Sequence, residues 1–129
     1  MIGSIGIDLV EIERIKRIIS KWNGRFLRRI FTESEIAYCE SNREPSRHYA
    51  ARFAAKEALF KSLGAGIGGE MRFTDVEVRN EGTGRPELEL HGTVRDRMKA
   101  AGFTAVHVSL SHTDMNAVAV VALEKNPAS

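Results

Sequence analysis

The chain has 129 residues, of which 43% are hydrophobic and 28% are charged, as in an ordinary globular domain, and we predict a single domain over residues 1–129. No apolar run approaches the roughly 20 residues that a membrane-spanning helix needs, and the first ten residues lack the basic leader of a signal peptide. The single cysteine excludes an internal disulfide and suits a reducing compartment. We therefore predict a cytoplasmic protein without a membrane partner.

The first half of the chain is mostly helical by pattern. Ile12, Ile15 and Ile19 recur at the spacing of an amphipathic helix, and Thr32 followed by Glu35 is a capping-box signature. The elements predicted here are a buried strand over 2–10 that ends near Asp8, and helices over 11–22, 25–30, 32–40 and 47–63.

Strands dominate the second half. The pattern predicts strands over 71–79, 87–92, 104–112 and 116–124, and a helix over 93–102 that Gly102 closes. A short turn joins the last two strands, which predicts a hairpin, and the final strand is apolar on both faces, which indicates a central place in its sheet. This segregation predicts an α+β fold with a mainly antiparallel sheet.

Basic residues gather in one segment of the first half. Residues 14–29 hold seven of the nineteen lysines and arginines and no acidic residue. The seven are Arg14, Lys16, Arg17, Lys21, Arg25, Arg28 and Arg29. This clustering favours a negatively charged partner, and it leaves nucleic acid, a phosphate-bearing ligand and an acidic protein open.

Asp8, at the end of the first predicted strand, is the first candidate for chemistry. It has two interpretations, as a cap for the helix that follows or as a metal ligand at the end of a strand. Glu11 and Glu13 need no special role, because acidic residues are favoured in the first turn of a helix.

Glu57 is the second candidate, because helical geometry places it among Ala50, Phe53 and Phe60 on the apolar side of its helix. A surface ion pair with Lys61, four residues on, is worth only about 0.2–0.5 kcal/mol. An unpaired carboxylate in an apolar setting costs several kcal/mol. We therefore expect either that the Glu57 side chain reaches solvent or that a cation lies beside it.

Phosphate-binding features follow Glu57 along the chain. Arg52, Lys56 and Lys61 share the helix, and glycines between residues 64 and 69 would let backbone N–H groups approach phosphate oxygens closely. The arrangement is not a P-loop, because the helix precedes the glycines.

His112 lies beside Ser111 and Asp114, but neighbours in sequence do not make a catalytic triad, whose members come from separate elements. We interpret His112 as part of a polar turn or as a residue near a phosphate. The remaining histidines lack the spacing of metal ligands, and the single cysteine argues against zinc.

Three separated motifs together resemble the holo-acyl-carrier-protein synthase family, which are small bacterial 4′-phosphopantetheinyl transferases. The motifs are GIDLVEIER at 6–14, RFAAKEALFKSLGAGIG at 52–68 and HVSLSHT at 107–113, and RFLRRIFTESE at 25–35 is similar to the family's second helical region. The resemblance implies an antiparallel sheet wrapped around a long helix. It also implies an enzyme of fatty acid biosynthesis that transfers phosphopantetheine from coenzyme A to a serine of apo-acyl carrier protein and releases adenosine 3′,5′-bisphosphate.

The resemblance also implies roles for individual residues. Asp8 and Glu57 match the family's magnesium ligands, and Lys61 matches the lysine beside the pyrophosphate. Positions that match contacts to coenzyme A are Arg52, His112 and Thr113, near the 3′-phosphate, and Gly64, Gly66, Ile67 and Pro86, along the nucleotide. Positions that match the carrier-protein docking surface are Arg14, Arg25, Phe26 and Arg29.

Members of this family are homotrimers with active sites between subunits, so Asp8 and Glu57 are expected to face Arg52 and His112 of a neighbouring chain. The residues leave open whether Glu57, directly or through a magnesium-bound water, or His112 takes the serine proton. Nucleic-acid binding through residues 14–29 is the main rival function, and we do not expect it, because no array of aromatic residues for base stacking accompanies the basic ones.

Overall fold

The computed structural model describes residues 1–64, 70–80 and 84–127. Five strands, five α-helices and one short 3₁₀ helix occupy these ranges. In chain order they are β1 (Ile2–Glu11), α1 (Ile12–Trp22), α2 (Gly24–Ile30), α3 (Glu33–Glu40), α4 (Pro45–Ser62), η1 (Phe73–Asp75), β2 (Val76–Asn80), β3 (Pro86–Leu90), α5 (Gly92–Ala100), β4 (Phe103–His112) and β5 (Asn116–Lys125). The predicted α+β class is confirmed.

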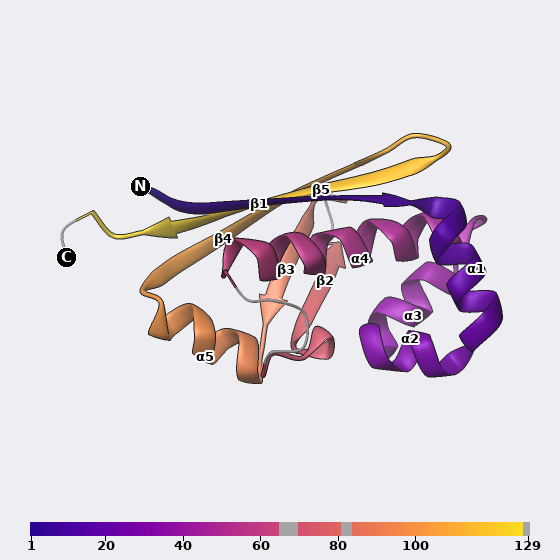
Figure 1. Cartoon of the computed structure of the whole chain (residues 1–129), viewed down its shortest axis with the longest axis horizontal. Coiled ribbons are helices and arrows are strands. Elements are labelled where there is room, and N and C mark those ends of the chain that lie inside the picture. The colour runs from indigo at the N-terminus through magenta and orange to yellow at the C-terminus, as the bar shows by residue number, and fades with distance from the viewer. Residues whose placement is uncertain (65–69, 81–83, 128–129) are drawn as a thin grey trace.

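The strands form two antiparallel sheets. The larger has the order β1-β5-β4, and the smaller pairs β2 with β3. The hairpin predicted between the last two strands is present, and β5 lies at the centre of its sheet as its apolar character predicted. Figure 1 shows α4 running along one face of the larger sheet, with α1, α2 and α3 gathered at one end and α5 near the other.

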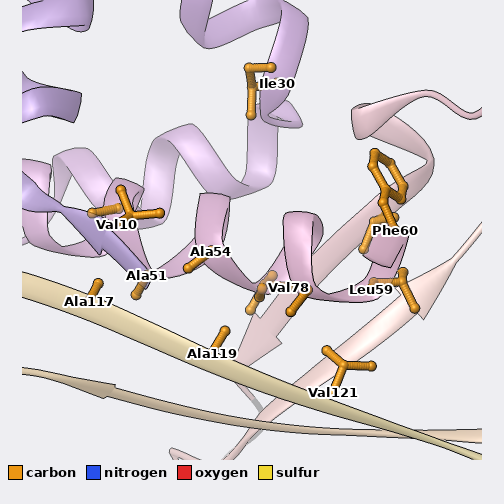
Figure 2. Close-up of a cluster of buried hydrophobic side chains, with 14 of the residues drawn as sticks. Val10, Ile30, Ala51, Ala54, Leu59, Phe60, Val78, Ala117, Ala119 and Val121 are labelled. Atoms are coloured by element: carbon orange, nitrogen blue, oxygen red, sulfur yellow. The ribbon is translucent and has the colours of Figure 1, made fainter. Parts of the chain in front are cut away.

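The core lies between α4 and β5. Ala51, Ala54 and Leu59 of α4 are buried against the inner face of β5, where Ala119 and Val121 are also buried (Figure 2). Small alanine side chains on both elements allow the helix to lie close to the sheet. The position of α4 along β1 and β5 therefore determines where the polar side chains of α4 lie relative to the sheet.

The start of α3 is held by neighbouring residues, and the start of α1 is held by a distant part of the chain. The capping box predicted at Thr32 is present, since the Thr32 hydroxyl accepts from the Glu35 N–H (3.2 Å) and the Glu35 carboxylate accepts from the Thr32 N–H (2.9 Å). At the start of α1, the Ile12 N–H donates to the Met115 carbonyl in the β4–β5 turn (2.9 Å). This bond ties the helical end of the molecule to the tip of the hairpin.

The prediction for the first strand was wrong in its end and in its burial. β1 continues beyond Asp8 to Glu11, and it is buried on one face only, because Ile5, Ile7 and Leu9 are 58–66% exposed. A run of isoleucines indicates a buried strand, but successive side chains point to opposite faces of a sheet, and α4 covers the face opposite these isoleucines.

The strand predicted over 71–79 was too long at its start. Residues Phe73–Asp75 form η1, and the strand begins at Val76. The Asp75 carboxylate accepts hydrogen bonds from the backbone N–H (3.0 Å) and the hydroxyl (2.6 Å) of Thr93 in α5. This contact turns the chain before it enters the sheet.

Two further observations bear on the sequence predictions. Cys39 is fully buried in α3, and burial raises the pKa of its thiol to about 12. Within the described ranges, no helix combines the length and the hydropathy needed to cross a bilayer.

Candidate active site

Asp8 and Lys61 form the first part of the candidate site. Asp8 lies on the inner face of β1, and its Oδ1 accepts a hydrogen bond from Lys61 Nζ at 2.8 Å. Lys61, at the end of α4, also donates to the Ile7 carbonyl (3.2 Å) and is half exposed. Asp8 is not the cap of α1, because Glu11 occupies the N-cap position and β1 continues to it.

Glu57 lies one turn before Lys61 on α4 and is half-buried. Of the two described carboxylates near Lys61, the ammonium pairs with Asp8 and forms no ion pair with Glu57. Burial raises the pKa of Glu57, the nearby Asp8 carboxylate raises it further, and Lys61 opposes the rise. Two carboxylates therefore lie close enough to repel each other, beside a single ammonium group.

This pair of carboxylates fits a magnesium ion. Magnesium prefers oxygen ligands, and it usually takes one or two carboxylates and completes its shell with water and substrate phosphates. A cation between Asp8 and Glu57 would also relieve the repulsion that raises the pKa of Glu57. Across the described parts of the chain, no group of three or more histidine, cysteine or acidic side chains is suited to a metal, so the remaining ligands would come from elsewhere.

Gly6 brings the two elements of this site together. A Cβ built on Gly6 would overlap the Ala58 carbonyl oxygen, so the backbones of β1 and α4 touch at this point. The Ser4 hydroxyl donates to the Ser62 carbonyl (2.6 Å) on the same side. Asp8 follows Gly6 on the same face of the strand, which places its carboxylate beside Lys61.

A second cluster surrounds Arg52, which is 3% exposed on α4. Its guanidinium donates to Asn80 Oδ1 (2.7 Å) and lies over the Tyr38 ring, 4.1 Å from its centre. Among the described residues, Arg52 Nε has no hydrogen-bond acceptor. A buried N–H without an acceptor costs free energy, so this guanidinium is suited to bind an anionic ligand through its free N–H group.

His48 lies near Arg52, and His112 lies at the β4–β5 turn. Burial lowers the pKa of His48, and the neighbouring Arg52, His112 and Arg47 side chains lower it further, which favours the neutral ring. His112 ends β4 and is exposed. The Thr113 hydroxyl accepts hydrogen bonds from the backbone N–H groups of residues 115 and 116, so this side chain holds the turn.

Within one chain, the described residues show no hydrogen bond or ion pair between the Asp8–Glu57–Lys61 cluster and the Arg52–His112 cluster. The structure brings Asp8, Glu57 and Lys61 together, and it places both Arg52 and His112 near His48. It does not join the two groups.

The other nucleotide positions are only partly described. Gly64 ends α4 with a φ of +72°, a left-handed conformation that favours glycine. Pro86 begins β3 and lines an open groove of about 550 Å³ with Arg85, Leu88 and Val106. Gly66 and Ile67 lie outside the described residues.

Three of the four predicted docking residues line one surface groove. Arg25, Phe26 and Arg29 of α2 meet the exposed Trp22 and the half-buried Ile18 of α1 around a groove of about 400 Å³. Arg14 is exposed on α1 but does not line this groove. The groove combines an apolar floor with two guanidinium groups, which suits an acidic partner with apolar side chains.

Sequence patterns did not identify several residues around the site. His48 and Asn80 join Arg52, and their positions follow only from the tertiary structure. Lys56 was grouped with the phosphate-binding residues, yet it is fully buried in an ion pair with Glu35. The capping-box position of Glu35 was visible in the sequence, but its second partner lies 21 residues away.

Comparisons with known proteins agree with this arrangement of elements. The chain matches the family described as the 4′-phosphopantetheinyl transferase superfamily over residues 4–119. It is 50% identical over 124 residues to a holo-[acyl-carrier-protein] synthase of Syntrophus aciditrophicus, and the match covers 96% of this chain and 97% of that protein.

Solved structures agree as well. The holo-(acyl-carrier-protein) synthase of Bacillus anthracis, in complex with coenzyme A (3′,5′-ADP), is 39% identical with a TM-score of 0.80, and the match covers 98% of this chain and 99% of that one. The holo-[acyl-carrier-protein] synthase of Neisseria meningitidis is 33% identical with a TM-score of 0.87, over 97% and 100% of the two chains.

The fold and the paired carboxylates thus occur in an enzyme of the phosphopantetheinyl transferase class. The chain belongs to the 4′-phosphopantetheinyl transferase superfamily. The resemblance inferred from its three motifs is confirmed.

Proposed function

We propose that this enzyme transfers the 4′-phosphopantetheine group of coenzyme A to a serine of apo-acyl carrier protein, in the cytoplasm and in the service of fatty acid biosynthesis. The observation that carries this proposal is the meeting of Asp8 and Glu57 beside Lys61, in a chain 50% identical to a holo-[acyl-carrier-protein] synthase. We further propose that residues 1–129 act as one transferase domain.

In the proposed reaction, the serine Oγ attacks the phosphorus nearest pantetheine. A new P–O bond forms to serine, the P–O bond to the second phosphate breaks, and adenosine 3′,5′-bisphosphate leaves. The serine proton passes to a base, for which the Glu57 carboxylate is the first candidate. His112 is the alternative base.

Asp8 and Glu57 are the residues that would hold a magnesium ion, which would supply positive charge to the pyrophosphate when bound. Lys61 binds the same pyrophosphate with its ammonium group, which in the free enzyme pairs with Asp8. Arg52, His112 and Thr113 are proposed to bind the 3′-phosphate, since Arg52 Nε still lacks an acceptor among the described residues. Gly64, Gly66, Ile67 and Pro86 are proposed to line the nucleotide.

The proposed carrier-protein surface is the groove between α1 and α2. Arg25 and Arg29 would pair with acidic side chains of the carrier, Phe26 and Trp22 would supply apolar contact, and Arg14 would add charge from α1. Such a surface steers an oppositely charged partner, and its effect weakens as salt is added.

We also propose that the enzyme is a homotrimer with active sites between subunits. Two observations support an assembly. The outer face of β1 is apolar and exposed, and the two clusters expected to share one ligand are not joined within one chain. In such an assembly, the Arg52 cluster of one copy would meet the Asp8 cluster of a neighbouring copy.

The test mixes the enzyme with coenzyme A, magnesium and an apo-acyl carrier protein and follows the carrier by mass spectrometry. We expect the carrier to gain the mass of one phosphopantetheine group. In Glu57→Gln we expect the rate to fall at least about 100-fold, because groups that only orient metal ligands are already worth about 10–100-fold.

The matched control is Glu33→Gln, which changes an exposed acid on α3 in the same way. It should react at the rate of the unchanged enzyme. Absence of any mass gain with several apo-carriers would reject the proposed function, and full activity in Glu57→Gln would reject the role of that carboxylate.

A further inference from the structure

Lys56 is a fully buried lysine on α4, immediately before Glu57. An ammonium group has three N–H donors, and here each has an acceptor. Lys56 Nζ donates to the Ile30 carbonyl at the end of α2 (2.7 Å), to Glu35 Oε1 in α3 (2.6 Å) and to the Phe73 carbonyl in η1 (3.0 Å). The side chain is therefore held from three directions.

Glu35 completes the network from the opposite side. Its Oε1 also accepts from the Thr32 N–H (2.9 Å), and its Oε2 accepts from the Val78 N–H in β2 (2.8 Å). Both charged side chains have no exposed surface. One buried ion pair thus fastens the end of α2, the start of α3, η1 and β2 to a single residue of α4.

The position of this pair along α4 matters for the candidate site. Consecutive residues of an α-helix are about 100° apart around its axis, so a fixed Lys56 also fixes the direction in which Glu57 leaves the helix. Glu57 then lies near Asp8 of β1. Lys56 also donates to the Ile30 carbonyl, and Ile30 directly follows the docking residue Arg29.

A contribution to stability does not explain such a pair well. Two charges lose their hydration when they are buried, and apolar residues of similar volume are often as stable or more stable in the same place. A saturated network of this kind is better suited to fix an orientation. The three acceptors around Lys56 Nζ hold α4 in one orientation about its axis.

We propose that the Lys56–Glu35 ion pair is a positioning device for the transfer reaction: it sets the direction of Glu57 toward Asp8 and holds the docking groove of α1 and α2 at a fixed place relative to that site. The inference depends on the proposed function. Lys56 itself does not contact substrate and acts through Glu57.

The test uses the double variant Lys56→Met/Glu35→Gln, which removes both charges together. The new glutamine amide oxygen keeps the bond from the Val78 N–H, and the Thr32 N–H then loses the acceptor that Glu35 Oε1 provides. Folding is checked by circular dichroism and thermal melting. Binding of Mn²⁺, as a probe of the two carboxylates, is measured by electron paramagnetic resonance alongside kcat and the KM for coenzyme A.

We expect a folded double variant whose Mn²⁺ affinity is about 10-fold or more lower, the range seen when groups that orient metal ligands are lost. The kcat should fall in parallel. The matched control is Tyr49→Phe, which removes a partly buried hydrogen bond between α4 and α3, from the Tyr49 hydroxyl to Glu40 (2.7 Å). It should keep the Mn²⁺ affinity and kcat of the unchanged enzyme.

A folded double variant with unchanged Mn²⁺ affinity and kcat would overturn the proposal and leave the pair a role in stability alone. If the double variant does not fold, Lys56→Arg decides, because a planar guanidinium keeps the charge but does not reproduce three donors on one nitrogen. Lowered Mn²⁺ affinity in Lys56→Arg supports the proposal, and unchanged affinity overturns it. Failure of the unchanged enzyme to transfer would instead reject the proposed function.

Discussion

At the scale of single residues, a neighbour without a side chain decides the position of Asp8. Gly6 lets β1 lie directly against α4, and its missing Cβ leaves room for the Ala58 carbonyl oxygen. The strand then carries Asp8 to Lys61. The position of the Asp8 carboxylate thus depends on Gly6, which has no side chain.

Gly6→Ala should therefore weaken both the fold and the site. The added methyl group meets backbone atoms that cannot rotate away, and overpacking of this kind typically costs about 1–3 kcal/mol. We expect a lower melting temperature and a loss of transfer activity, since β1 must move away from α4 and take Asp8 with it.

Gly3→Ala is the control for this prediction, because its Cβ meets the side chains of Lys125 and Phe103. Those side chains can shift, so the loss of stability should be smaller. An unchanged melting temperature in Gly6→Ala would contradict the close approach of β1 to α4.

At the level of single residues, the sequence pattern places Glu57 on the apolar side of its helix. In the structure Glu57 is half-buried, and among the described residues Lys61 pairs with Asp8 instead. The charged side chain of this helix that is fully buried is nevertheless Lys56. Buried alanines of α4 lie on several sides of the helix. The sheet covers one side and Phe31 and Phe73 cover another, so the apolar pattern defines no single inward face.

At the scale of elements, local signals were reliable where the structure is local. The capping box at Thr32 and the hairpin of β4 and β5 depend on residues that are close in sequence, and both are present as predicted. The start of β2 was missed because it depends on Asp75 and Thr93, which lie 18 residues apart. No window of sequence around Asp75 contains its partner.

Asp75 serves as a distant cap for α5, and its effect on stability should depend on pH. Burial acts to raise its pKa, but the two hydrogen bonds from Thr93, together with the nearby Arg72 and His91, hold the pKa below its ordinary value of 3.8. The stabilisation is thus present above the ordinary pKa and is lost as the pH falls through the lower pKa of the folded state.

Asp75→Asn should be less stable than the unchanged protein at neutral pH, by about 0.3–1 kcal/mol for the charge at the start of a helix. The difference should shrink as the pH is lowered below the ordinary pKa of Asp75. Urea denaturation across this range measures it, with Asp96→Asn, an exposed acid on α5, as the control. A difference that stays constant with pH would contradict the assigned role.

At the scale of the whole molecule, the larger sheet has one covered face and one bare face. α4 covers the inner face, whereas Ile5, Ile7, Leu9 and Val120 are 38–66% exposed on β1 and the adjacent β5. Ile7 lies directly opposite Val120 in the sheet. An exposed apolar patch of this kind is typical of an interaction surface.

Ile7→Asp should therefore convert the proposed trimer into single chains. A charge in the centre of this patch cannot be buried without a partner. Light scattering coupled to gel filtration should give three times the 14.3 kDa of one chain for the unchanged protein and a single chain mass for the variant. Transfer activity should fall with the assembly, because the proposed site takes residues from two copies.

The control for this prediction is Ala100→Asp, at the exposed end of α5. It should remain assembled and active. A single-chain mass for the unchanged protein would reject the trimer. The sequence motifs imply this assembly only through the resemblance to a family. A hydrophobic strand has the same sequence pattern whether its second face packs on a helix of its own chain or on another copy.

The burial of Cys39 has a practical consequence for experiments on this enzyme. Its thiol is the sole sulfhydryl of the chain, it has no exposed surface, and burial raises its pKa to about 12. It will stay inert toward maleimide reagents while the fold is intact. A cysteine introduced on the surface can therefore take a fluorophore or spin label selectively, without first mutating the native one.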